Sequence, residues 1–476
     1  MVARRASAPI FAALAAIIMC VPTASAAPHW GPATPPNPYL GPVGTATMHG
    51  DAASSDVTPL PGPGAQAHSV DARPLAAACP TLLEGSDELV VALCTPIIGR
   101  TPTVHLLDPK SPALLGGSLA HLELAKGSLL GGVYAYLDND DRLVAVDGER
   151  KLQRISHSRD AEGRWSLHVD ETVNLAGAIA EGDNVTGLSP DWDGNVWFAT
   201  AAGVVGAVDQ SGQVRSRTLE SGEQVQNSIS TSPAGTAVAT THALYQLRLV
   251  GGRIEVDWRQ AYDRGPARKP GQLSWGTGST PTYFGPATGS DYLAVVDNAD
   301  PTVSLRVFDT SSGRDMCTIP VLDGGERPNG SENSPIGIGD SVYVASTYGY
   351  PYPATPDGAG PSVPDSAPFG GGLTRVDIDP VGCHQVWNSP IRSAAVPHLS
   401  TGDGNLYTVV RSGPESTTPL DTFTFTVLNP ADGRVVAATP LPGTVANDTL
   451  QMSGTITKAG SYLQGTITGM LQIQSK

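Results

Sequence analysis

The 476-residue sequence has few charged and few aromatic residues, and it lacks a long apolar run after Val21. Charged residues make up 16% and aromatic residues 6% of the chain, whereas glycine and proline number 54 and 41. Helical repeats need more Leu, Glu and Lys than this, so the composition argues against them. A membrane-spanning helix needs roughly 18 consecutive apolar residues. We therefore expect many short strands joined by tight turns, and no transmembrane span.

The first 26 residues have the order of a secretory signal. Arg4 and Arg5 precede an apolar run over 10–21, and small residues occupy 24–26. This pattern predicts a cleavable signal peptide over 1–26 and export to the extracellular space or the cell envelope. The processed chain keeps 27 basic and 45 acidic residues, a formal net charge of −18. This net negative charge repels the phosphate backbone and therefore disfavours nucleic acid as a partner.

Cysteine is scarce, and its spacing excludes several kinds of site. One of the five cysteines lies in the signal segment, and the other four are Cys79, Cys94, Cys317 and Cys383. An even number in an oxidising compartment favours two disulfides. Three connectivities are possible, and the short spacing of the first two residues favours Cys79–Cys94 with Cys317–Cys383. The sequence has no CxxC motif, so we expect no structural zinc site.

A repeat organises the rest of the chain. Short β-rich runs end in Asp or Asn before a glycine-containing turn, most clearly at 205–209, 305–309, 373–377 and 425–429. Such turns favour residues that tolerate positive φ or cap their own backbone. Another β-rich run and a short Gly/Pro/Ser-bounded segment precede each one, which gives a unit of four strands. About eight units, with seven as the alternative, predict an all-β protein folded as a β-propeller.

The last unit, over 452–474, supplies only three predicted strands. An open sheet edge is an aggregation hazard and needs cover. We predict that an N-terminal arm, residues 27–78, crosses to the last blade and provides its outer strand, with 45–49 as the best short strand. The propeller domain is then expected over 79–476.

The repeat resembles the PQQ-like β-propeller family. The resemblance is carried by a strand, a glycine turn and a closing tryptophan, as in 245–247 with Gly252 and Trp258, or 376–377 with Gly382 and Trp387. It covers residues 80–474 loosely and two units well, and it implies a fold more than an activity. Quinoprotein dehydrogenases of this superfamily carry a more regular tryptophan repeat and often adjacent cysteines. This chain has 7 irregularly placed tryptophans and no adjacent cysteines, which disfavours PQQ as a cofactor.

In propellers, the loops that enter the innermost strands gather on one face around the central channel. Polar residues on such loops can converge on one ligand. Their amide, hydroxyl and carboxylate groups suit a small polar molecule, a glycan or a cation such as Ca²⁺. The alternative is that they cap turns and bond neighbouring backbone. The predicted channel-mouth residues are Asn184, Asn227, Thr277, Ser279, Glu332, Asn333, His398 and Asn447.

Three further groups of residues, two acidic turns and one His/Asp cluster, allow a metal interpretation. The acidic turns at 138–141 and 191–195 lack the distal Glu of an EF-hand, so ordinary turn chemistry is the favoured interpretation. His49, Asp51 and Asp56 could bind a metal or share a proton, but we expect the side chains of this arm to face water.

No motif identifies a catalytic residue, and whether the protein is an enzyme stays open at this point. The leading hypothesis is a non-catalytic propeller that binds a small molecule, a glycan or a protein partner. The alternative is an enzyme. Residues 191–200 resemble strand starts of lactonase and strictosidine-synthase-like propellers, which implies a metal-dependent hydrolase, and a quinone-dependent dehydrogenase is the weaker possibility.

Overall fold

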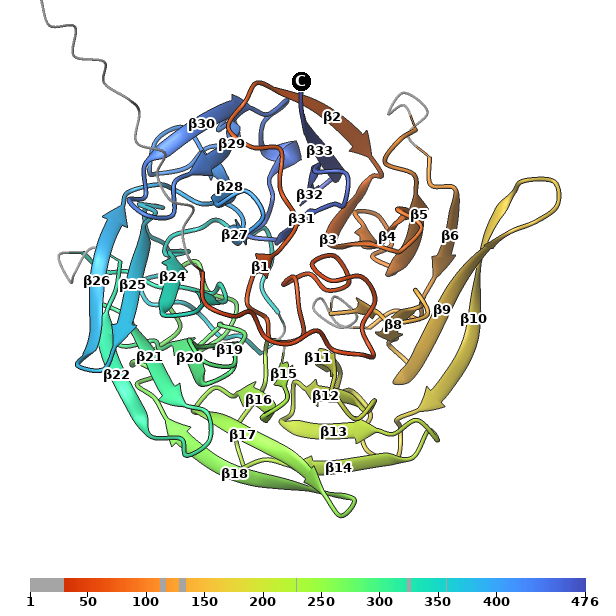
Figure 1. The fold of residues 1–476 in the computed structure, drawn as a ribbon, viewed down its shortest axis with the longest axis horizontal. Coiled ribbons are helices and arrows are strands. Elements are labelled where there is room, and N and C mark those ends of the chain that lie inside the picture. Colours follow the sequence, from red (N-terminus) through yellow and green to blue (C-terminus); the bar gives the residue numbers. More distant parts are fainter. Residues whose placement is uncertain (1–29, 112–116, 128–133, 228, 323–326, 357) are drawn as a thin grey trace, which may run out of the picture.

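The computed structural model describes residues 30–476 apart from 112–116, 128–133, 228, 323–326 and 357. The predicted signal peptide over 1–26 lies outside these residues. Eight sheets are arranged radially around a central channel, as Figure 1 shows. The prediction of an all-β propeller is confirmed, with eight blades rather than seven. Among the described residues, no helix has the length and apolar character needed to cross a membrane.

Blades 1–4 follow one another along the chain, and each is an antiparallel sheet of four strands. From the channel outward, their strands are β3 (Ala77–Glu84), β4 (Val90–Pro96), β5 (Thr103–Leu107) and β6 (Ala120–Glu123); β7 (Tyr136–Leu137), β8 (Leu143–Val146), β9 (Lys151–Arg159) and β10 (Trp165–Asn174); β11 (Val185–Pro190), β12 (Val196–Thr200), β13 (Val204–Val208) and β14 (Val214–Thr218); and β15 (Ser230–Ser232), β16 (Gly235–Ala239), β17 (Ala243–Val250) and β18 (Arg253–Ala261).

Blades 5–8 continue the same pattern, and the last two incorporate strands from the N-terminal arm. A single turn of 3₁₀ helix, η3 (Val445–Asn447), precedes blade 8. The strands are β19 (Thr282–Phe284), β20 (Tyr292–Val296), β21 (Ser304–Asp309) and β22 (Asp315–Pro320); β23 (Ile336–Ile338), β24 (Ser341–Ala345), β25 (Leu373–Asp379) and β26 (Gly382–Ser389); β1 (Val57–Thr58), β27 (His398–Ser400), β28 (Asn405–Arg411), β29 (Phe423–Leu428) and β30 (Val435–Pro440); and β31 (Gly454–Ile456), β32 (Tyr462–Thr466), β33 (Gly469–Ser475) and β2 (His68–Pro74).

The N-terminal arm closes the ring, although not with the residues that the sequence favoured. Strand β2 pairs antiparallel with β33 along its whole length and is the outer strand of blade 8. The expected strand over 45–49 was wrong: Thr47 makes only an isolated bridge to Tyr136 in blade 2. Strand β3 of blade 1 begins at Ala77, two residues before the predicted start of the propeller domain at 79.

The arm also fills the channel. Its residues 45–58, here called the channel segment, cross the centre of the disc (Figure 1). Backbone N–H groups of the inner strands or their ends, in six of the eight blades, donate hydrogen bonds to its carbonyl oxygens. These donors are Glu84, Leu137, Thr231, Tyr283, Gly337, Leu399 and Thr401. A buried backbone donor without a partner is costly, so the channel segment stabilises the innermost edge of the ring.

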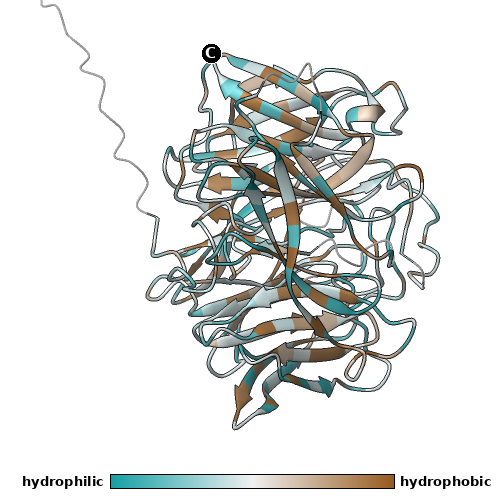
Figure 2. Cartoon of the chain, turned by 90° about the vertical axis from the view of Figure 1, so that its right-hand side faces the viewer, coloured by the Kyte–Doolittle hydropathy of each residue, from teal (hydrophilic) through white to brown (hydrophobic). Residues whose placement is uncertain are grey.

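Apolar packing joins each blade to the next. Figure 2 shows the sheets from the side, with apolar residues along their strands. Among the described residues, one buried hydrophobic cluster fills each of the eight interfaces, including the interface between blades 8 and 1. Strands buried on both faces explain the apolar runs of the sequence. The inner strands are therefore covered on both faces, whereas outer strands such as β10 and β30 remain largely exposed at the rim.

Tryptophans lock two interfaces. The Trp258 Nε1–H donates to the Thr310 carbonyl at 2.8 Å, and the Trp387 Nε1–H donates to the Pro430 carbonyl at 3.0 Å. Each indole lies against a glycine of the next blade, Gly313 or Gly433, where a Cβ atom would collide with the ring. These contacts explain why the repeat contains both a tryptophan and a turn glycine.

The two disulfides pair as the spacing favours. Cys79–Cys94 joins β3 to β4 inside blade 1. Cys317–Cys383 joins β22 to β26, the outer strands of blades 5 and 6. The second bond therefore connects two neighbouring blades at the rim of the disc.

Ring closure by β2 predicts a specific cross-link. Ser69 and Gln474 are partners in register, so the double variant Ser69→Cys/Gln474→Cys is expected to form a third disulfide during oxidative folding. Peptide mapping by mass spectrometry under non-reducing conditions checks this. The matched control, Ser69→Cys/Thr218→Cys, places the second cysteine on the outer strand of blade 3 and should remain unlinked. Free thiols at 69 and 474 in folded protein would contradict the closure.

Candidate functional site

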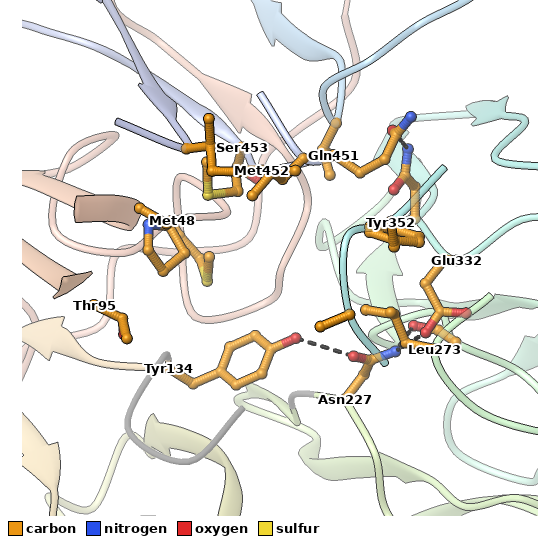
Figure 3. Close-up of a pocket in the computed structure, with 18 of the residues that line it drawn as sticks. Met48, Thr95, Tyr134, Asn227, Leu273, Glu332, Tyr352, Gln451, Met452 and Ser453 are labelled. Carbon is orange, nitrogen blue, oxygen red and sulfur yellow. Dashed lines mark hydrogen bonds between the residues drawn. The ribbon is translucent and has the colours of Figure 1, made fainter. Parts of the chain in front are cut away.

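A cavity of about 430 Å³ opens at one mouth of the channel. The loops that enter inner strands form most of its wall, to which the channel segment adds His49 and also Met48, labelled in Figure 3. We call this cavity the cup. Much of its lining is apolar, with Leu273, Val396 and Met452 among the contributors. The arm thus gives the channel a lining that the ring alone would lack.

A short chain of polar side chains follows one wall of the cup. The Tyr134 hydroxyl donates to Asn227 Oδ1 at 3.2 Å, and Asn227 Nδ2 donates to Glu332 Oε1 at 3.1 Å (Figure 3). Asn227 Nδ2 also donates to the Gly278 carbonyl. The three side chains come from the loops before blades 2, 4 and 6, so the fold brings together residues that are far apart in the sequence.

Glu332 is the unusual member of this wall. The residue is 7% exposed, and its Oε2 is buried without a hydrogen-bond partner among the described residues. Burial raises the pKa of Glu332 to about 7, although hydrogen bonds from Asn227 and from the Leu273 backbone N–H act in the opposite direction. A side chain at position 278 would collide with this carboxylate. Glu332 therefore changes charge near neutral pH, which is typical of functional carboxylates.

Another part of the wall is held by amide groups and a strained backbone. Asn333 Nδ2 donates to Gln451 Oε1 at 3.0 Å, and Gln451 Nε2 donates to the Ser393 carbonyl at 2.7 Å. Leu450 and Gln451 have φ values of 51° and 59°. Left-handed backbone at non-glycine residues costs free energy and clusters at functional sites. The hydrogen bonds of Gln451 fix this strained turn in place.

His49 and Asp56 of the channel segment form a buried pair. His49 Nδ1 lies 2.8 Å from Asp56 Oδ1, and the Ser334 hydroxyl donates to Asp56 Oδ2. Asp56 is fully buried and has a φ of 53°. Burial lowers the pKa of His49, but the charge and hydrogen bond of Asp56 outweigh it and leave the pKa above its ordinary value. The expectation that these arm residues face water was wrong, because the two side chains are buried and contact one another inside the channel.

His398 is buried close to this pair but does not line the cup. Neither ring nitrogen has a hydrogen-bond partner among the described residues. Burial lowers the pKa of His398 to about 4, so its ring is neutral at pH 7. Of the two imidazoles, His49 is therefore the one that carries a charge most readily.

The structure separates the eight predicted channel-mouth residues into two groups. Asn227, Glu332 and Asn333 line the cup, whereas the other five do not. The buried hydroxyls of Thr277 and Ser279 donate to the carbonyls of Val296 and Asn333.

The remaining residues have local roles. Asn447 Nδ2 donates to the Pro442 carbonyl at 2.6 Å beside η3. The Asn184 carbonyl accepts the Ala201 N–H at the open end of the β11–β12 pair. The side chains of Thr277, Ser279 and Asn447 thus bond to backbone carbonyls, which is the alternative to ligand binding considered from the sequence.

Sequence reasoning missed several residues of the cup. Gln451 follows the predicted site at Asn447 by four positions and could have been found by extending that loop. Tyr134 precedes the short strand β7, and Tyr352 lies in the long loop between β24 and β25. Neither tyrosine belongs to a recognisable motif, since only the closed ring brings them to the cup.

The acidic turns have structural partners. Asp138 Oδ2 lies 2.9 Å from Arg142 and 2.8 Å from Arg154. Asp191 Oδ2 accepts the Trp197 Nε1–H at 2.7 Å. Across the described residues, no three His, Cys, Asp or Glu side chains are grouped as metal ligands.

The buried carboxyl of Glu332 predicts a pH-dependent gain in stability when it is removed. A folded-state pKa above the unfolded value of 4.5 favours folding at low pH, and this benefit is lost as pH rises through about 7. Glu332→Gln should therefore be more stable than wild type at pH 8, by up to ~3 kcal/mol, and gain little at pH 4.5. Denaturant unfolding at both pH values checks this. Glu162→Gln, on an exposed side chain, is the control; an equal effect of Glu332→Gln at both pH values would contradict it.

Comparison with known proteins supports the fold and leaves the activity open. No family model matches the chain. An uncharacterized protein of Archaeoglobus fulgidus is 26% identical over 337 residues, 62% of this chain. The match covers 65% of that relative, so the chain spans less than two thirds of its length.

Solved structures similar to this chain include several β-propellers. Quinohemoprotein alcohol dehydrogenase from Comamonas testosteroni is 11% identical with a TM-score of 0.52, over 90% of this chain and 80% of that one. BamB from Moraxella catarrhalis is 14% identical with a TM-score of 0.38, over 75% and 94%. At this identity, the likeness to the alcohol dehydrogenase shows the fold alone.

Proposed function

We propose that this protein is an exported, non-catalytic β-propeller that binds a small, largely apolar molecule in the cup. The observation that carries the proposal is an apolar cavity whose wall holds a buried carboxylate with one unpartnered oxygen. Ligand pockets typically combine apolar walls with a few fixed polar groups, and volumes of roughly 300–1,000 Å³ are usual. The cup, at about 430 Å³, has the volume for such a molecule.

Glu332 defines the polar requirement of the ligand. Buried polar atoms are almost always hydrogen-bonded, and Glu332 Oε2 has no donor among the described residues. A ligand N–H or O–H group would satisfy it, and a protonated amine would also balance its charge. Tyr134 and Asn227 hold Glu332 Oε1 through their hydrogen-bond chain, so the acceptor is fixed before the ligand arrives.

The apolar lining of the cup disfavours glycans, one of the ligand classes considered from the sequence. A glycan presents hydroxyls on most faces and would leave them unpaired against Leu273, Val396 and Met452. A mostly apolar molecule with one donor group fits better. The rim, with Ile98 at 91% exposure beside the cup residue Ile97, leaves a protein partner as the alternative occupant of this face.

Hydrolysis is the second candidate function. His49 lines the cup and its Nδ1 is held by a buried carboxylate, the arrangement that orients a histidine general base. This version of the enzyme alternative needs no metal. Turnover of the 4-nitrophenyl ester of 4-phenylbutanoic acid, abolished in Asp56→Asn but retained in Asp365→Asn, would replace the binding proposal by this one.

Matched probes test the binding proposal. 4-Phenylbutylamine and 4-phenylbutan-1-ol share one apolar body and differ only in the head group. By isothermal titration calorimetry at pH 8, both should bind, the amine more tightly. Glu332→Gln should weaken the amine about tenfold or more, because a charge-assisted hydrogen bond is lost. Amine binding should also fall as pH drops below about 7, where Glu332 gains a proton.

The control for this experiment is Glu162→Gln, which changes an exposed carboxylate remote from the cup. It should bind both probes as wild type does. If neither probe binds wild type, or if the amine binds Glu332→Gln as tightly as wild type, the proposal is wrong.

A further inference from the structure

We infer that the molecule held in the cup carries an anionic group, a carboxylate or a similar oxyanion, which binds to Nε2 of His49. This inference rests on the proposed function and adds a second polar group to the ligand. The ligand class is then an apolar molecule with a carboxylate at His49 and a hydrogen-bond donor at Glu332.

The geometry of His49 leaves one ring nitrogen for a ligand. Its Nδ1 is engaged by Asp56 Oδ1 at 2.8 Å, and the side chain lines the cup. The second Asp56 oxygen accepts the Ser334 hydroxyl, so both carboxylate oxygens are used inside the channel. His49 can therefore meet a ligand only through Nε2, which is a donor whenever the ring is protonated.

The surroundings of His49 favour the protonated ring. Asp56 and Asp51 of the channel segment act on it, and their charges raise the pKa of His49 against the effect of burial. Asp51 accepts two hydrogen bonds from Ser55, and burial raises its own pKa to about 6. His398, from β27, is neutral at pH 7 because burial lowers its pKa to about 4. Arg100 also lines the cup, so the loss of anion preference in a His49 variant is what separates the imidazole from this guanidinium.

The backbone of the channel segment is strained beside His49 and Asp56, and this conformation brings the two side chains together. Ser54 and Asp56 both have a φ of 53°, although neither is a glycine. Two left-handed residues in three turn the channel segment so that the Asp56 side chain reaches back to His49. Strain of this kind persists only where surrounding contacts enforce it. Here those contacts are two hydrogen bonds. The Gly337 N–H donates to the Ser55 carbonyl, and the Leu399 N–H donates to the Asp56 carbonyl.

An anionic group on the ligand would also give a partner to His49, the second ionisable side chain of the cup. His49 and Glu332 have opposite charges when ionised, and they line one cavity. At a pH where His49 is protonated, an amine gives the imidazolium no partner, whereas a carboxylate on the ligand pairs with it. In a protein of net charge −16, anion capture needs a local cation, and the cup offers His49 beside Arg100 in its lining.

The test compares 4-phenylbutanoate with 4-phenylbutan-1-ol, which differ only in the anionic head. Isothermal titration calorimetry at pH 6 should show the carboxylate binding about tenfold more tightly than the alcohol. This preference should shrink as pH rises and His49 loses its proton. In the ¹H–¹⁵N NMR spectrum, 4-phenylbutanoate should shift the His49 ring resonances. His49→Gln should remove the preference while binding of 4-phenylbutan-1-ol is kept.

Two controls keep the inference separable from folding and from the proposed function. His157→Gln changes a histidine on β9, outside the cup, and should leave the preference intact. Asp56→Asn keeps the imidazole ring of His49 but should lower its pKa. The preference for the carboxylate should then be lost at a lower pH than in wild type. If the alcohol and 4-phenylbutylamine bind but the carboxylate binds no better than the alcohol, the inference alone is overturned. If none of the three probes binds, the proposed function itself fails.

Discussion

The pairing between the channel segment and the inner strands is the interaction on which this structure depends. A propeller leaves the innermost edge of each blade facing a channel, where backbone donors would otherwise need water. In this protein one stretch of the N-terminal arm accepts hydrogen bonds from six blades, and the same arm then continues to β2, the outer strand of blade 8. One segment therefore organises both the centre and the closure of the ring.

The candidate site is a consequence of that constraint. Because the channel segment occupies the channel, the open mouth becomes a cup rather than a pore, and the segment contributes Met48 and His49 to its lining. The loops before the inner strands add Asn227, Glu332 and Gln451. Polar groups from blades far apart in the sequence can converge only if the ring closes, so the geometry of the site depends on the same hydrogen bonds as the fold.

The repeat and the shared last blade could be predicted because turn residues recur locally: Asp or Asn before a glycine marks each hairpin. The closing strand was predicted at the wrong residues. Strand β2 (His68–Pro74) largely faces solvent, so its polar sequence does not indicate a strand. Three of eight predicted site residues line the cup, since loop position alone does not tell which side chains turn inward. The sequence indicated the cluster of His49, Asp51 and Asp56 but not its burial, because polar residues in an arm indicate burial only when their partners are known.

Amide hydrogen exchange of the inner strands tests the central claim most directly. The N–H groups of Thr231, Tyr283 and Gly337 lie at the channel, where the arm supplies their acceptors. The account predicts that these amides exchange as slowly as those of the neighbouring strands β16, β20 and β24. Rapid exchange at these positions in an otherwise protected propeller would show that the arm does not occupy the channel, and would contradict both the closure and the cup.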